Sequence, residues 1–269
     1  MGRSKSGQGG LGPAQAEEPP LRLEAIIGDA DTRRPVHNVA DAPWRPMCLM
    51  RLHYTNGATA IGSGVLIAPD LILTAAHNLY SLKLKTLITG ADVWVGAQNG
   101  SAAASGVGVW AKAHPKYTKN GPGNPARFNF DYGLLKLKTT KLGDWAGDVF
   151  DVAAMTPPTN RDLLSHSVVV AGYPADRTPA TLTAAEGPVL DDPLSNVVFG
   201  YQMDTAKGQS GGPVFRHDPA TGRTSLAGVH VAGFHDHHFN LARRFSAKMK
   251  KEILTWSKEA DREAGGALV

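Results

Sequence analysis

The chain has 269 residues, 42% of them hydrophobic, which is long and apolar enough for one or two domains with a large core. A formal net charge of +4, without a basic stripe interleaved with aromatic residues, disfavours a nucleic-acid partner. No apolar run is long enough to span a bilayer, which disfavours a membrane partner. The single cysteine, Cys48, excludes an intrachain disulfide, and we expect it to be a buried strand residue within PMCLMRL.

Residues 1–24 are rich in Gly, Pro, Ser, Gln and Ala, and they lack the apolar middle of a signal peptide. Segments of this composition rarely bury enough apolar surface to fold. We therefore expect a disordered leader or pro-segment over residues 1–24. The sequence as given indicates a cytoplasmic location, and export by a route that it does not show stays open.

From Ala25 onward, short apolar runs are separated by Gly, Pro, Asn and Asp. Many are rich in Val, Ile and Leu, for example GSGVLIA, LILTAA, DVWVGA, SVVVAGY and LAGVHVAGF. This pattern predicts many short strands in a sandwich or barrel and disfavours a doubly wound α/β fold. Weaker strand signals from about residue 139 to 165 indicate a connection between two halves. Helical spacing of Phe245, Met249, Ile253 and Trp256 predicts a C-terminal helix.

Three stretches carry the candidate catalytic residues: His77 in LILTAAHNLY, Asp131 in FDYGLLKLK and Ser210 in KGQSGGPVF. Each residue alone has an ordinary explanation as a capping or turn residue. Together they fit one mechanism, because a serine hydroxyl needs a base and a histidine base needs a carboxylate to orient it. The attacked carbonyl also needs N–H donors for its developing charge, and the backbone amides of Gly208 and Ser210 could supply them.

The stretch GQSGG also matches the nucleophile elbow of α/β-hydrolases, which requires an Asp and then a His after the serine on a parallel sheet. Few residues follow Ser210, and no strand–helix alternation precedes it. The chain order of His77, Asp131 and Ser210 instead matches the order in chymotrypsin. Triad order and strand-rich pattern therefore point to the same interpretation.

The blocks TAAH, DYGLLKL and GQSGGPVF resemble the signature blocks of trypsin-like serine proteases. AIIGDADTRRPV, VVVAGYPADR and AGVHVAGF resemble the bacterial glutamyl endopeptidase branch. The resemblance implies an all-β fold of two antiparallel six-stranded, chymotrypsin-like β-barrels with a C-terminal α-helix. It places the first barrel in residues 25–150 with His77 and Asp131, the second in 151–245 with Ser210, and the helix in 246–260.

The resemblance further implies a serine endopeptidase that prefers Glu or Asp on the acyl side of the cut. It makes Thr205, His230, Val231 and Gly233 the substrate-binding residues, with a hydroxyl and an imidazole holding the substrate carboxylate. We expect protein or peptide substrates, a monomer, no cofactor and no metal, and the resemblance suggests secretion.

Three positions depart from the family pattern. Leu241 could narrow the pocket, and one of the adjacent Arg243 and Arg244 could face it and reinforce selection of acidic residues. Gln209 stands where many trypsin-like enzymes have an Asp that pairs with a freed N-terminal amine. This argues against that activation switch.

Several alternatives stay open. The chain could be a protease-like binding module with weak or no catalysis, or an esterase that uses the same triad. The histidines of FHDHHF, His235, His237 and His238, are more consistent with a polar loop than with a metal site, because ligands so close in sequence cannot easily surround one ion. Glu24 precedes Ala25, so an enzyme with this specificity could cut itself there, and the new amine could join His230 and Thr205.

Overall fold

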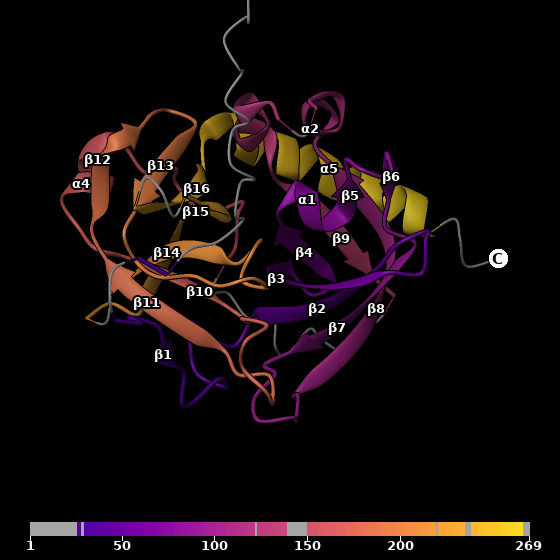
Figure 1. The fold of residues 1–269 in the computed structure, drawn as a ribbon, viewed down its shortest axis with the longest axis horizontal. Coiled ribbons are helices and arrows are strands. Elements are labelled where there is room, and N and C mark those ends of the chain that lie inside the picture. Colours follow the sequence, from indigo (N-terminus) through magenta and orange to yellow (C-terminus); the bar gives the residue numbers. More distant parts are fainter. Residues whose placement is uncertain are drawn as a thin grey trace, which may run out of the picture.

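The computed structural model describes residues 26–27, 30–121, 123–138, 150–218, 220–234 and 238–265. Strands dominate, in two groups that lie side by side (Figure 1). The predictions for the leader 1–24, for the cut before Ala25 and for the loop 235–237 fall outside the described residues. The all-β fold class with a C-terminal helix is confirmed.

The first group is a closed barrel of six antiparallel strands, in the order β2-β3-β4-β9-β8-β7. Side chains along β7 alternate between buried and half-buried, as expected for strands with one face on a packed interior. Cys48 on β2 is fully buried in this interior, as predicted. The strand bounds are β2 Met47–His53, β3 Thr59–Ala68, β4 Leu71–Thr74, β7 Gly90–Val95, β8 Ala104–Ala113 and β9 Gly133–Leu137.

The second group is an eight-stranded antiparallel sheet in the order β1-β11-β10-β14-β15-β16-β13-β12. Only Pro188 separates β11 from β12, yet the two strands lie toward opposite ends of this order. The chain therefore passes from one edge of a rolled sheet to the other. The bounds are β1 Arg34–Pro35, β10 Val168–Gly172, β11 Thr183–Gly187, β12 Val189–Leu194, β13 Val198–Tyr201, β14 Pro213–Asp218, β15 Arg223–Phe234 and β16 Phe239–Arg244.

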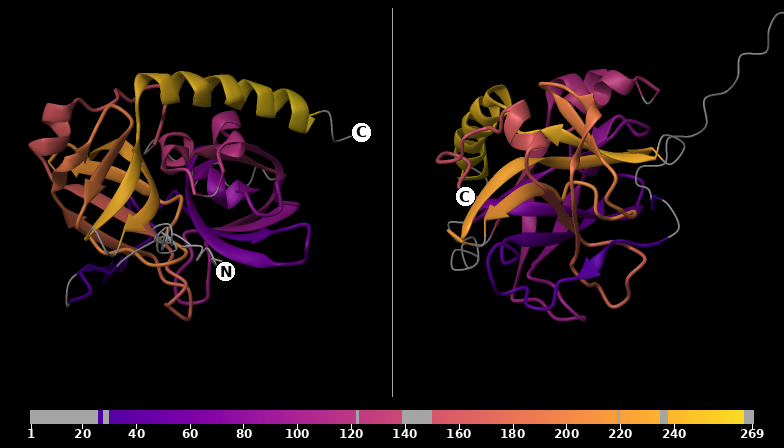
Figure 2. Two further views of the ribbon diagram at one scale, coloured as in Figure 1. Left: turned by 45° about the horizontal axis from the view of Figure 1, so that its top comes forward. Right: turned by 90° about the vertical axis from the view of Figure 1, so that its left-hand side faces the viewer.

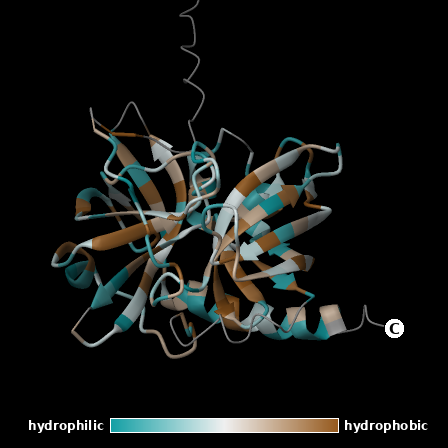
Figure 3. Cartoon of the chain, turned by 90° about the horizontal axis from the view of Figure 1, so that it is seen from below, coloured by the Kyte–Doolittle hydropathy of each residue, from teal (hydrophilic) through white to brown (hydrophobic). Residues whose placement is uncertain are grey.

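The second sheet differs from the expected six strands for two local reasons. Proline cannot donate a hydrogen bond to a ladder, so Pro188 divides one long strand into β11 and β12. The short strand β1, expected at the start of the first barrel, instead pairs with β11, through Arg34 with Ala184 and Pro35 with Thr183. Hydrophobic and hydrophilic residues alternate along strands of both groups (Figure 3).

Short helices and a small hairpin lie between the strands, and a long helix, α5, ends the described chain. The bounds are α1 Ala76–Leu79, α2 Pro115–Lys119, the 3-10 helix η1 Pro125–Phe130, α4 Asn160–Leu164, α5 Ala247–Gly265, and the hairpin strands β5 Tyr80–Ser81 and β6 Thr86–Leu87.

Helix α5 leaves the second sheet after β16 and runs across to the first barrel (Figure 2). Its apolar side chains Met249, Ile253 and Trp256 join a core cluster that contains residues of both groups. Glu263 on its outer end accepts a hydrogen bond from Trp110 of β8 at 2.7 Å. Each half is thus covered by a terminal segment of the other, because β1 precedes the first barrel but lies on the second sheet.

Candidate active site

His77 and Asp131 meet at one end of the first barrel because they flank two neighbouring strands. β4 and β9 are antiparallel partners, with Thr74 opposite Gly133. His77 lies just after β4 in α1, and Asp131 lies just before β9 at the end of η1. Residues that leave one strand and enter its antiparallel neighbour are close in space. The fold therefore brings these two predicted residues together.

Asp131 contacts His77 through both carboxylate oxygens. The ring Nδ1 lies 2.8 Å from Oδ2, and the backbone N–H of His77 donates to Oδ1 at 2.9 Å. The aspartate side chain is 1% exposed and the histidine side chain 14%. An ionised carboxylate only accepts hydrogen bonds, so the proton between them belongs to Nδ1. The other ring nitrogen, Nε2, is then the basic one.

Ser210 lies in a turn that packs against the first barrel. Its carbonyl oxygen accepts hydrogen bonds from the backbone N–H of Ser63, at 2.9 Å, and from Nδ2 of Asn78, at 2.8 Å. Asn78 directly follows His77, so the serine turn is joined to the segment that carries the histidine. At Gly211, with φ +85°, a Cβ would overlap Thr74 and the carbonyl of Ser63. Only glycine fits this junction.

Gly208 also requires glycine, on the other side of the serine. Its φ is +101°, and a Cβ would lie 2.6 Å from the carbonyl oxygen of Tyr173 and 2.9 Å from the nitrogen of Ala175. Its carbonyl accepts a hydrogen bond from Oγ of Ser63 at 2.7 Å. The backbone of Gly208 is therefore held closely on two sides.

His230 lies on β15 next to the serine turn. The N–H of Gly211 donates to the carbonyl of His230 at 2.9 Å, and the N–H of His230 donates to the carbonyl of Gly212 at 2.9 Å. The ring is fully buried, with Nδ1 2.6 Å from the hydroxyl of Tyr201, and its buried Nε2 has no hydrogen-bond partner among the described residues.

The His230 imidazole is neutral at physiological pH. Burial lowers its pKa to about 3, and the nearby His77 adds to this.

Thr205 and Gly233 both lie beside Asn240 of β16, and Val231 directly follows His230 on β15. Thr205 is fully buried, and its hydroxyl donates to Oδ1 of Asn240 at 2.9 Å. Asn240 in turn donates from Nδ2 to the carbonyl of Met203 at 2.8 Å. Val231 sits at an irregularity in the β15–β16 ladder, and Gly233 is buried opposite Asn240.

The expectation that one of the paired arginines faces the pocket is wrong. Arg243 donates to the carbonyls of Asn129, at 2.7 Å, and Val197, at 2.8 Å. Arg244 donates to the carbonyls of Ser195, at 2.9 Å, and Pro158, at 2.5 Å.

Both guanidinium groups are thus engaged by backbone oxygens of flanking loops, which are strong acceptors that must be satisfied when buried. Leu241 is also buried, within a core cluster, opposite Gly200 on β13.

Sequence reasoning missed several polar residues that support the site: Ser63, Asn78, Tyr201, Asp204 and Asn240. The hydrogen bond from Asn78 to Ser210 joins positions that are 132 residues apart. No local spacing pattern connects such positions. Only Asn78 and Asp204 had a signal in the sequence, because Asn78 follows His77 and Asp204 precedes Thr205.

The described residues contain no group of three His, Cys, Asp or Glu side chains placed to hold a metal ion. No described helix is long and apolar enough to cross a bilayer.

Comparison with known proteins gives a consistent family. A profile described as Trypsin matches residues 37–246. A protein of Bacillus subtilis named extracellular metalloprotease is 28% identical over 261 residues, which is 95% of this chain and 77% of that protein. A glutamyl endopeptidase of Bacillus licheniformis is 27% identical over 256 residues, which is 92% of this chain and 73% of the relative.

The fold is shared with a solved Glu endopeptidase in complex with MPD, with a TM-score of 0.71 at 23% identity. The match covers 87% of this chain and all of that one. The profile match covers more than half of the chain and coincides with both strand groups. The chain belongs to the trypsin family and is a serine endopeptidase.

Proposed function

We propose that Ser210 is the nucleophile, His77 its general base and Asp131 the residue that orients the base. The observation that carries this proposal is the two-point hydrogen bonding of Asp131 to His77, directly beside the turn that holds Ser210. Nε2 takes the proton from Oγ of Ser210 as Oγ attacks the scissile carbonyl, and it then gives this proton to the departing amine. Asp131 keeps its charge and stabilises the imidazolium formed in between.

The tetrahedral intermediate carries negative charge on the former carbonyl oxygen. We assign the donors for this oxygen to the backbone N–H groups of Gly208 and Ser210. Support comes from the left-handed backbone at Gly208, which side chains rarely adopt, and from its close packing on Tyr173 and Ala175. Donors held in place before the reaction are effective because they do not have to reorient as charge develops.

For the acyl side of the cut, we propose a preference for Glu or Asp, with the carboxylate bound by His230 and Thr205. If the hydroxyl of Tyr201 donates to Nδ1 of His230, the neutral ring carries its proton on Nε2. That buried Nε2–H then needs an acceptor, and a substrate carboxylate supplies one. The substrate would compete with Asn240 for the single hydroxyl proton of Thr205. Backbone groups of Val231 and Gly233 would bind the extended substrate chain.

A binding module without catalysis and an esterase remain the competing functions. A fluorophosphonate probe separates the first from an enzyme, because it reacts only with an activated serine. We expect labelling of the wild type and none of Ser210→Ala. An unlabelled wild type that still melts as a folded protein would reject the proposal in favour of a binding module.

Cleavage of a peptide library tests the preference. We expect cuts after Glu and Asp to dominate over cuts after Gln, Leu and Lys. Cleavage of simple esters with no cleavage of any peptide would favour the esterase. Secretion and the monomeric state stay predictions, the first supported by the word extracellular in the name of the Bacillus subtilis relative.

A further inference from the structure

Asp204, which precedes Thr205, binds the segment that leads into the first barrel. Its side chain is fully buried. Oδ1 accepts a hydrogen bond from the backbone N–H of Ile27 at 2.5 Å, and Oδ2 accepts from the N–H of Thr32 at 2.6 Å and from its hydroxyl at 2.8 Å. The N–H of Asp204 donates back to the hydroxyl of Thr32 at 3.1 Å. Four hydrogen bonds therefore join Asp204, in the segment between β13 and the serine turn, to Ile27 and Thr32.

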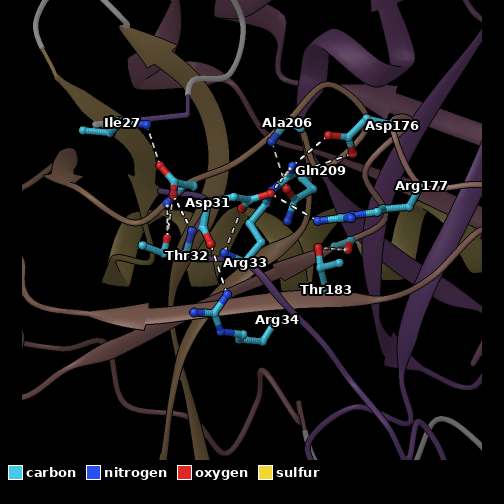
Figure 4. A network of polar contacts seen from close by, with 12 residues as sticks. Ile27, Asp31, Thr32, Arg33, Arg34, Asp176, Arg177, Thr183, Ala206 and Gln209 are labelled. Atoms are coloured by element: carbon cyan, nitrogen blue, oxygen red, sulfur yellow. Dashed lines mark hydrogen bonds and ion pairs between the residues drawn. The ribbon is translucent and has the colours of Figure 1, made fainter. Parts of the chain in front are cut away.

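The same segment is also bound to the loop after β10 (Figure 4). Arg33, which is 4% exposed, donates from two nitrogens to Asp31, at 2.8 and 2.9 Å, and from two nitrogens to Asp176, at 2.7 and 3.1 Å. Hydrogen bonds from Arg33 lower the pKa of Asp176. Such forked pairs fix orientation as well as distance. Arg177 adds a further contact with Asp31 at 3.1 Å.

The loop reached by Arg33 packs on the segment of Gly208. The N–H of Ala175, next to Asp176, donates to the carbonyl of Lys207 at 2.6 Å. Tyr173 and Ala175 also fill the space where a Cβ of Gly208 would lie. Contacts thus run from Arg33 through Asp176 and Ala175 to the backbone at 207–208, while Asp204 holds the other end of the same segment.

We propose that Asp204 and the Arg33–Asp176 pair are positioning residues for catalysis. They use Ile27, Thr32 and Arg33 to hold residues 204–208 from both ends, and so fix the N–H of Gly208 toward the reacting carbonyl. This inference rests on the proposed function of Ser210 and Gly208. Gln209, the residue before Ser210, does not join residues 204–208 to Ile27, Thr32 or Arg33. Its side chain instead accepts a hydrogen bond from the nearby N–H of Ala206 at 2.9 Å.

Two isosteric substitutions test the proposal. In Asp204→Asn the amide must turn its NH2 toward either Ile27 or Thr32, both of which are donors, so one attachment is lost. In Asp176→Asn the charge that holds Arg33 is lost at a side chain that is 50% exposed, so folding is little affected. Asp92→Asn, in an exposed ion pair with His53 on the first barrel, is the matched control.

We expect kcat to fall by about 10- to 100-fold in both test variants, as displacement of a catalytic group by roughly 1 Å can cost 100-fold. KM should change little, the loss should be equal for substrates with Glu and with Gln before the cut, and Asp176→Glu should restore most of kcat. A kcat equal to that of Asp92→Asn in both variants would overturn the proposal. A loss that vanishes at a temperature where each variant is fully folded would also overturn it.

A measurement independent of turnover separates this inference from the proposed function. In a Ser210→Ala background, amide hydrogen exchange in peptides covering 204–209 should be at least about tenfold faster in both variants than in the Asp92→Asn control. Unchanged exchange would reject the positioning role even for an active enzyme. If the wild type shows no turnover while exchange responds as expected, only the proposed function fails.

Discussion

His77 and Asp131 come from neighbouring strands of one closed barrel and bond to each other directly. Ser210, in the turn before β14 of the second sheet, depends on groups from outside that sheet, because its carbonyl is bound by Ser63 and Asn78 of the first barrel. Asp204 is likewise bound by the segment 27–32. One half thus carries the proposed catalytic pair, bonded within itself, whereas the other carries the proposed nucleophile and pocket, which other segments hold in place. Substitutions should therefore act locally in the first half and at a distance in the second.

The largest effect should come from the catalytic residues themselves. Ser210→Ala and His77→Ala should each lower kcat/KM on a Glu-containing peptide by about four orders of magnitude or more, because triad members act as a unit. Thermal unfolding should show that both variants remain folded. Turnover near the wild-type level in His77→Ala would show that the base has been assigned wrongly.

The junction between the two halves should be the next most sensitive place. In Gly211→Ala the new methyl group would overlap Thr74 and Ser63, so we expect a loss of about 2–4 kcal/mol in the free energy of unfolding, together with a loss of activity. Gly222→Ala is the control, since Gly222 also has positive φ but nothing within 4 Å of a Cβ. It should cost only about 1 kcal/mol. Urea unfolding measures the stability of both variants. Equal losses in the free energy of unfolding would show that the junction tolerates the methyl group.

A smaller effect concerns pH and the buried ring of the second half. The unfolded chain binds a proton at His230 near pH 6.5, whereas the folded chain does so only near pH 3. The unfolded state therefore holds more protons in this window. From this group, the free energy of unfolding should fall by about 2 kcal/mol as the pH drops from 7 to 5, with a slope of at most about 1.4 kcal/mol per pH unit.

The variant His230→Gln isolates this contribution. Both proteins carry Ser210→Ala, and urea unfolding is measured between pH 7 and 5. The free energy of unfolding should depend less on pH with Gln at position 230 than with His. Parallel pH profiles of the two proteins would contradict the assignment of a depressed pKa to His230.

The smallest effect is expected on the outer face of the first barrel. His53 and Asp92 form a hydrogen-bonded pair at 2.9 Å, with side chains that are 37% and 40% exposed. Exposed pairs contribute little because water screens them, so Asp92→Asn should change the free energy of unfolding by about 0.5 kcal/mol or less. A change above about 1.5 kcal/mol in the free energy of unfolding, measured by chemical denaturation, would show that substitutions on this face cost more stability than we expect.

Local patterns predicted much of this molecule. The strand blocks around His77 and Asp131 and the spacing of Phe245, Met249, Ile253 and Trp256 indicated the barrels and the final helix, because each pattern reports the burial of one face. The strand count of the second sheet could not be predicted, since it depends on Pro188 and on β1 pairing with a distant strand.

The same distinction holds within the site. Motifs named His77, Asp131 and Ser210 as candidates, but not Tyr201 or Asp204, whose hydrogen-bond partners are brought together only by the folded chain. The expectation that one of Arg243 and Arg244 faces the pocket failed for this reason, because the carbonyls of Val197 and Ser195 that bind them come from a neighbouring loop.

The crossing of β1 to the second sheet and of α5 to the first barrel has a consequence for the resistance of the protein to proteolysis. The segment with β1 lies on the second sheet, and α5 lies on the first barrel, with Trp110 and Glu263 joined across 153 positions. Neither half can unfold without releasing a segment that covers the other, so the two should unfold as one cooperative unit. Cleavage by another copy of the enzyme requires a locally opened chain, and its rate follows the population of open states. We expect the crossed segments β1 and α5 to keep that population small and thereby to limit self-digestion.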